Sequence, residues 1–161
     1  MDDLNELYQD IILEHHKRPR NFRALPQPTH RAAGHNPLCG DEVEVYLAVC
    51  DGRIEEVAFQ GQGCAISRAS ASLMTEALAG KRIDEARKVF AEVKDTLSGD
   101  APEAGMDEIG ELAALQGVRR FPARVKCATL PWHAFEAALE GTKRVSTEGW
   151  GDLSRFGAAE I

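Results

Sequence analysis

The hydrophobic pattern changes its period along the chain, and this change limits the possible folds more than any other feature of the sequence. Apolar residues occupy every second position from Val43 to Val49, and the alternation continues at Val57 and Phe59. Such alternation predicts two half-buried strands. The Asp-Gly pair at 51–52 lies between them, so we expect a β-hairpin with a two-residue type I′ turn.

Elsewhere the apolar residues recur every three or four positions, which predicts helices. The strands are not interleaved with helices in a βαβ repeat, so the predicted fold class is α+β, a small antiparallel β-sheet covered by helices. Residues 21–37 contain three prolines and little periodicity and are interpreted as an extended connector. Pro131 should begin a new helix or kink a longer one. The expected helices cover residues 2–19, 64–80, 83–97, 106–117 and 121–141.

Composition favours a compact protein that does not bind nucleic acid. Apolar residues make up 43% of the 161 positions, enough for one buried core, and we expect a single domain over 1–145 with a loosely held tail over 146–161. The net charge of −7 disfavours nucleic acid as a partner. The sequence contains no apolar run long enough for a membrane helix and no signal-peptide pattern, so we expect a cytoplasmic protein without a membrane partner.

Three cysteines and one aspartate are the candidate functional residues. Cys39 and Asp41 lie in a Pro/Gly turn before the first predicted strand of the hairpin. Cys64 follows Gly61-Gln62-Gly63 and opens a helix, where free backbone N–H groups favour the thiolate. Cys127 follows a cluster of basic residues, which would have the same effect. In a reducing compartment such cysteines are ligands or nucleophiles more often than disulfides.

A zinc site would explain this set, because zinc accepts thiolate sulfur and carboxylate oxygen in a tetrahedral arrangement. The spacing alone leaves another interpretation open, since cysteine is often buried as a small apolar residue. Cys50 ends a strand with no helix start or basic cluster nearby, and we interpret it as structural.

A basic cluster lies at the C-terminus of the first predicted helix. It contains His15, His16, Lys17, Arg18 and Arg20, and we interpret it as a solvated helix end that complements the helix dipole. A docking patch for an acidic partner is the alternative.

The motifs around these residues resemble the iron–sulfur assembly proteins of the IscU/NifU type, and more closely the SufU branch of that family. The resemblance covers almost the whole chain. It is carried by Leu-Asn-Glu-Leu-Tyr at 4–8, the run 11–21 with Glu-His-His-Lys-Arg-Pro-Arg-Asn, Asn-Pro-Leu-Cys-Gly-Asp at 36–41, Gly-Gln-Gly-Cys-Ala-Ile-Ser at 61–67 and Arg-Val-Lys-Cys-Ala-Thr-Leu-Pro-Trp at 124–132.

The resemblance implies an IscU/SufE-like fold and a metal site formed by Cys39, Asp41, Cys64 and Cys127, without Cys50. For the SufU-like group it implies a zinc-dependent sulfurtransferase. Such a protein accepts persulfide sulfur from a SufS-type cysteine desulfurase and passes it to SufBCD-type cluster assembly machinery. An iron–sulfur cluster scaffold with the same ligands is the alternative, and an adaptor with structural zinc is a further one.

Three departures from scaffold-type members favour zinc. Lys126 occupies the position directly before the third cysteine where scaffold members carry a histidine. The segment 122–126 replaces the Leu-Pro-Pro-Val-Lys segment that a dedicated chaperone reads. Residues 65–126, 62 in all, separate the second and third cysteines, a longer spacer than in scaffold members. We expect Cys39 to be the catalytic thiolate, because its loop can move, and Arg124 to stabilise thiolate or persulfide charge.

Overall fold

The computed structural model describes residues 2–37, 40–98, 109–119, 121–142 and 144–146, with side chains from residue 6 to residue 142 of these ranges. The elements in chain order are α1 Asp2–Lys17, β1 His30–Asn36, β2 Asp41–Cys50, β3 Arg53–Gln62, α2 Ala65–Leu78, α3 Ile83–Ser98, η1 Gly110–Val118, α5 Pro122–Glu140 and β4 Arg144–Ser146.

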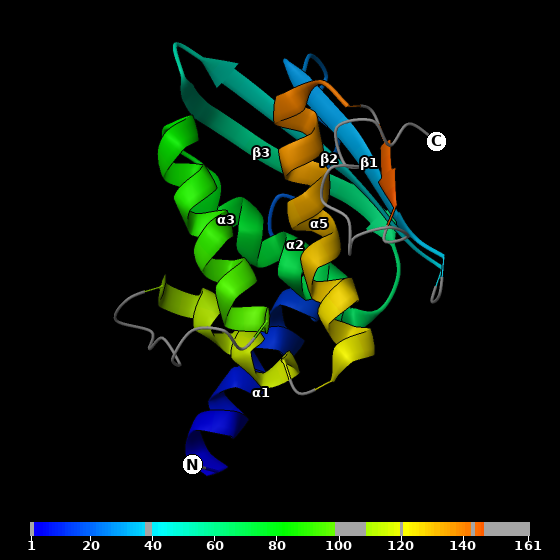
Figure 1. Ribbon diagram of the computed structural model, residues 1–161, viewed down its shortest axis with the longest axis vertical. Coiled ribbons are helices and arrows are strands. Elements are labelled where there is room, and N and C mark those ends of the chain that lie inside the picture. The colour runs from blue at the N-terminus through cyan, green and yellow to red at the C-terminus, as the bar shows by residue number, and fades with distance from the viewer. Residues whose placement is uncertain (1, 38–39, 99–108, 120, 143, 147–161) are drawn as a thin grey trace.

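The sheet has the strand order β3-β2-β1-β4, as Figure 1 shows. The pairs β1–β2 and β2–β3 are antiparallel, and the short β4 pairs with β1 in parallel. The predicted hairpin is confirmed, because Asp51 and Gly52 both have the positive φ angles, 52° and 76°, that a type I′ turn requires. The α+β class is therefore confirmed, with one parallel edge strand in addition to the expected antiparallel sheet.

The strand β1 was not expected, because residues 21–37 were interpreted as a connector throughout. It pairs with β2 along its whole length, from His30 opposite Leu47 to Asn36 opposite Asp41. Its sequence, His-Arg-Ala-Ala-Gly-His-Asn, has no β-branched residue. The pairing with β2 supplies the stability that local propensity does not, since strand preference depends strongly on tertiary context.

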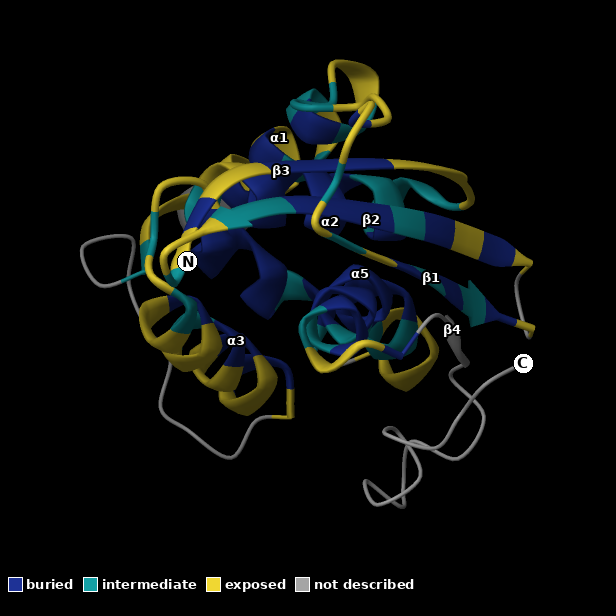
Figure 2. Cartoon of the chain, turned by 90° about the horizontal axis from the view of Figure 1, so that it is seen from above, coloured by how far each residue is buried: buried dark blue, intermediate teal, exposed yellow. Residues whose placement is uncertain are grey.

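The helices α2 and α5 cover one face of the sheet, and Figure 2 shows the buried surface between α5 and the strands. Trp132 and Phe135 of α5 are fully buried, and the Trp132 indole N–H donates to Ser70 Oγ of α2 over 3.1 Å. The helix α5 continues past Pro131 to Gly141, which has the left-handed φ of 82° common at helix ends. Pro131 therefore lies inside one longer helix and does not begin a new one.

The other predicted helices are found with adjusted bounds. Residues 83–98 form α3, and Cys64 is the N-cap of α2. The helix expected over 106–117 is a 3₁₀ helix, η1, where the structure describes it, and residues 99–108 lie outside the described part. The expected tail beyond Ser146 also lies outside it. No helix in the described ranges combines the length and apolarity needed to cross a bilayer.

His15 is not part of a solvated helix end, and the interpretation of the basic cluster is wrong for this residue. Its side chain is only 2% exposed and lies between three elements. The ring Nδ1 is 2.7 Å from Ser72 Oγ of α2, and Nε2 is 3.1 Å from a carboxylate oxygen of Glu111 in η1. Because a carboxylate only accepts hydrogen bonds, Nε2 carries the hydrogen in this pair. His15 therefore ties α1 to the α2 and η1 layer.

Candidate metal centre

Three of the predicted ligands come together from three separate elements. Asp41 is the first residue of β2, Cys64 is the N-cap of α2, and Cys127 lies in the second turn of α5. One ligand atom of each lies within 4.8 Å of the others. Asp41 and Cys127 are almost completely buried, and Cys64 is partly exposed. The centre therefore has a closed inner side and an opening at Cys64.

Asp41 and Cys64 are held together by two contacts. The backbone N–H of Cys64 donates to Asp41 Oδ1 over 2.8 Å, and Cys64 Sγ is 3.5 Å from Asp41 Oδ2. At the same helix end, the backbone N–H of Ser67 donates to Cys64 Sγ over 3.5 Å, as expected for an N-cap side chain. The helix N-terminus thus provides backbone donors to both the Asp41 carboxylate and the Cys64 sulfur.

Two glycines make this close approach possible. A Cβ atom on Gly61 would lie 2.1 Å from the carbonyl oxygen of Glu42, and one on Gly63 would lie 2.5 Å from Asp41 Oδ1. Real Cβ atoms do not approach other atoms so closely. The Gly-Gln-Gly run therefore lets the end of β3 pass next to the start of β2, which brings Cys64 to Asp41.

Cys127 is fixed from two sides. Its Sγ is 3.7 Å from the carbonyl oxygen of Ala123, one turn earlier in α5. The side-chain amide of Asn36 donates to the same sulfur over 3.8 Å. Asn36 is buried at the end of β1, so this contact connects the sheet to the ligand on α5.

The donor set fits zinc in chemistry and in spacing. Zinc accepts both thiolate and carboxylate ligands, at about 2.3 Å from sulfur and about 2.0 Å from oxygen. In a tetrahedron with these bond lengths a sulfur and an oxygen ligand lie about 3.5 Å apart, and the Cys64 Sγ to Asp41 Oδ2 distance is 3.5 Å. The same donors also fit an iron–sulfur cluster, because clusters are held mainly by cysteine thiolates. The donor set thus fits a zinc ion and an iron–sulfur cluster alike.

Comparison with known proteins places the chain in a family. The family model described as the NifU-like N-terminal domain matches residues 7–128, which include all four predicted ligands. The zinc-dependent sulfurtransferase SufU of Bacillus subtilis is 40% identical over 137 residues, covering 85% of this chain and 92% of that protein.

The chain belongs to the NifU-like N-terminal domain family.

Other similar proteins carry different descriptions. The iron–sulfur cluster assembly scaffold protein IscU of Streptococcus pyogenes is 36% identical over 140 residues, covering 87% of each chain. A crystal structure of a candidate iron–sulfur cluster assembly scaffold protein for the SUF system of Fervidobacterium islandicum superposes with a TM-score of 0.75. It is 32% identical, and the match covers 84% of this chain and 98% of that one. The resemblance expected from the sequence motifs is confirmed.

The remaining predicted residues of this NifU-like domain have different positions. Cys39 lies outside the described residues, so its part in the centre stays a prediction. Cys50 is exposed at the end of β2, next to the hairpin turn, and is not in the group of clustered donors. Arg124 is exposed in the first turn of α5 and lines the same hollow as Cys64.

Two residues of the NifU-like centre were not assigned a role from the sequence. Asn36 contacts Cys127 across 91 positions of sequence, and nothing in its local pattern indicates that partner. Gly63 was quoted only as part of a motif, whereas its missing side chain makes space for the Asp41 carboxylate. The signal in the sequence for this close approach is a glycine directly before a cysteine at the start of a helix.

Proposed function

We propose that this protein is a zinc-dependent sulfur acceptor and carrier of the cytoplasm. It takes persulfide sulfur from a SufS-type cysteine desulfurase and delivers it to SufBCD-type assembly machinery. The observation that carries the proposal is the convergence of Asp41, Cys64 and Cys127 at a helix N-terminus. The similarity to the zinc-dependent sulfurtransferase of Bacillus subtilis supports the same function.

Cys39 is the proposed sulfur acceptor. Zinc, when bound, would keep the cysteine sulfurs deprotonated and shielded. The Cys39 thiolate attacks the outer sulfur of the donor persulfide, the sulfur–sulfur bond of the donor breaks, and the donor cysteine leaves as a thiolate. Cys39 then carries the transferred sulfur as a persulfide, so that one sulfur–sulfur bond is lost and one is gained. Asp41, Cys64 and Cys127 remain in place on rigid elements while Cys39 reacts.

Arg124 is proposed to stabilise the negative charge of the reacting sulfurs. It lies three residues before Cys127 on α5 and lines the hollow that reaches Cys64. Replacing it by alanine should slow sulfur acceptance while the zinc content stays unchanged. An unchanged rate would remove Arg124 from the mechanism.

A scaffold that holds a nascent iron–sulfur cluster on the same ligands is the second candidate. The Streptococcus pyogenes relative carries that description, and the donor set accepts it. Lys126 before Cys127 and the long spacer over 65–126 favour the zinc proposal, because the resemblance associates both with the SufU-like group.

Elemental analysis of anaerobically purified protein tests the choice between the two. One zinc per chain without acid-labile sulfide supports the sulfur carrier, whereas iron with matching sulfide supports the scaffold. The acceptor role is tested with Cys39→Ser and, as the matched control, Cys50→Ser. After incubation with a desulfurase and cysteine, mass spectrometry should find the added sulfur in the Cys50→Ser protein and not in the Cys39→Ser protein. Equal sulfur loading of both variants would contradict the mechanism, and a folded Cys39→Ser protein with full activity would favour an adaptor with structural zinc.

A further inference from the structure

An apolar groove of about 710 Å³ opens beside the metal centre, between α1, η1 and α5. Leu13 of α1 and Phe121 before α5 are 47% and 52% exposed, although both are large apolar residues. Cys64 lines the same groove, so the groove adjoins the open side of the centre. The groove is formed mainly by Tyr8, Ile12, Leu13, Ile66, Val118 and Phe121.

An exposed apolar surface of this kind marks an interaction site more often than a solvated face. Arg124 is the only charged residue among the described residues that line the groove. The groove therefore suits an occupant that is apolar and carries net negative charge.

The path of the chain after α5 leads toward this region. The strand β4 runs parallel to β1, with Ser146 opposite His35 (Figure 1). The next residue of β1 is Asn36, whose side chain contacts Cys127 of the centre. The chain thus leaves β4 at the end of the sheet that carries the metal ligands.

The segment 147–161 has the chemistry that the groove requires. It contains three large apolar residues at a spacing of three, Trp150, Leu153 and Phe156, and its three acidic residues outnumber its single arginine. Fifteen residues of extended chain reach about 50 Å, so the segment can contact surfaces well away from β4.

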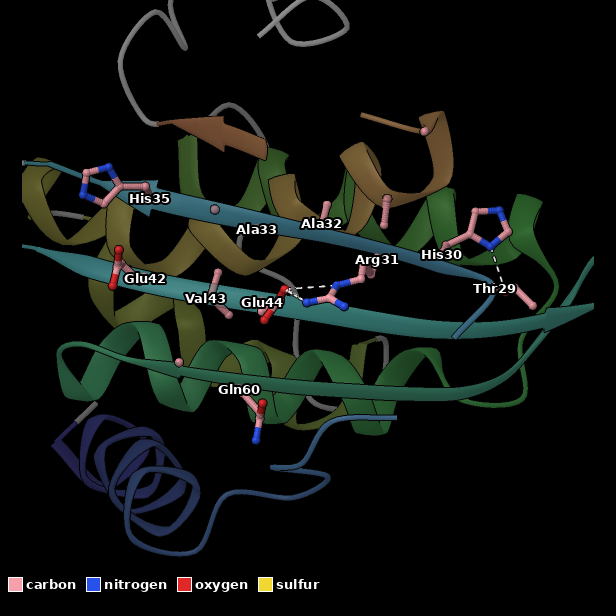
Figure 3. A pocket seen from close by; sticks show the side chains of 14 residues that line it. Thr29, His30, Arg31, Ala32, Ala33, His35, Glu42, Val43, Glu44 and Gln60 are labelled. Atoms are coloured by element: carbon pink, nitrogen blue, oxygen red, sulfur yellow. Dashed lines mark hydrogen bonds and ion pairs between the residues drawn. The ribbon is translucent and has the colours of Figure 1, made fainter. Parts of the chain in front are cut away.

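A second hollow, of about 860 Å³, lies along β1 and β2 and is closer to β4 (Figure 3). Unlike the apolar groove, it is lined by several charged and polar side chains. Arg31 forms an ion pair with Glu44, and the Tyr46 hydroxyl donates to the same carboxylate. Burial alone would raise the pKa of Glu44, but these two partners lower it overall, so the pair stays charged at neutral pH. The side chains of Trp150, Leu153 and Phe156 would bury less apolar surface in this hollow than in the apolar groove.

We propose that residues 147–161 dock in the apolar groove through Trp150, Leu153 and Phe156. The proposal does not depend on sulfur transfer, because its test measures the environment of one tryptophan.

Trp150 reports the docking directly. The chain has two tryptophans, and the other, Trp132, is fully buried and stacks on Phe90. Acrylamide quenching is measured on the full chain, and a Trp150→Phe protein identifies the Trp132 contribution. If the segment is docked, the Stern–Volmer constant of Trp150 should be lower than that of a free peptide of residues 147–161, because a buried indole is shielded from the quencher.

Two matched variants locate the contact. Leu13→Gln removes an apolar side chain from the groove, whereas Leu7→Gln makes the same change on the same helix at a residue of similar exposure, 43%, outside the groove lining. We expect Leu13→Gln to raise the quenching of Trp150 to the peptide value and Leu7→Gln to leave it unchanged.

Three results would overturn the proposal. Quenching of the full chain at the peptide value means that the segment is not docked. Protection that both leucine variants leave equal means that it docks elsewhere, for example in the hollow of Figure 3. Protection that disappears on dilution means that it occupies the groove of a second copy.

Discussion

The closest contact in the metal centre gives the sharpest prediction, because Gly63 has no room for a side chain. A methyl group at this position would lie 2.5 Å from Asp41 Oδ1 and 2.8 Å from its Cγ. The buried Asp41 carboxylate would have to move away from the Cys64 N–H, from which it now accepts a hydrogen bond at 2.8 Å. A hydrogen bond to a charged group contributes about 1.5–3 kcal/mol, and relief of an overpacked contact costs about 1–3 kcal/mol more.

We therefore expect Gly63→Ala to lower the free energy of unfolding of the zinc-free protein by about 2.5–6 kcal/mol, the sum of these two contributions. Zinc affinity should fall by about 10–100-fold, the usual effect of displacing a group that orients a ligand. Urea unfolding and zinc competition with a chromogenic chelator measure the two quantities. Gly117→Ala is the control, since a Cβ there meets nothing within 4 Å. Unchanged affinity in Gly63→Ala would refute the position of Asp41 in the centre.

Two further predictions concern histidines away from the centre. His15→Leu removes the contacts to Ser72 and Glu111 and should lower the free energy of unfolding, measured by urea titration, by about 2–3 kcal/mol. Lys17→Ala, at an exposed position on the same helix, should change this free energy little. Equal effects of the two substitutions would contradict the bridging role of His15. Burial, with a smaller contribution from Lys94, lowers the pKa of His133 from 6.5 to about 3. Only the unfolded chain takes up this proton between these values, so stability should fall as pH drops below 6.5, by about 1.4 kcal/mol per pH unit. His133→Gln should remove this part of the slope, and parallel stability profiles would contradict it.

The sequence predicted the elements whose signal is local. The hairpin has strict alternation with Asp51-Gly52 at its turn, and the helix at Cys64 begins where a glycine run ends. The strand β1 was missed because its small and polar residues carry no strand signal, and its stability comes from β2 and from α5 packed on it. An element such as β1, which is stabilised by residues far away in the sequence and not by its own pattern, is not revealed by the sequence.

The candidate site shows the same division. The residue types and their flanking motifs identified Asp41, Cys64 and Cys127, but their spacing along the chain could not establish that they meet. Their approach depends on the sheet register and on the packing of α5 against α2. The role of Asn36 could not be predicted at all, because it rests on a contact to α5 that exists only in the folded protein.

The proline within α5 interrupts the hydrogen-bond ladder of the helix next to the predicted ligand Cys127. A residue at position 131 would normally donate its N–H to the carbonyl four positions earlier, which is that of Cys127, and proline has no N–H to donate. Contacts from other elements hold the helix on both sides of this position. Residues 127–132 are buried, the Ser70 hydroxyl of α2 donates to the carbonyl oxygen of Ala128, and the Asn36 side chain of β1 donates to Cys127 Sγ. The position of Cys127 is therefore set by the neighbouring strand and helix as much as by its own helix, so a change in the packing of β1 or α2 would reach the predicted ligand directly.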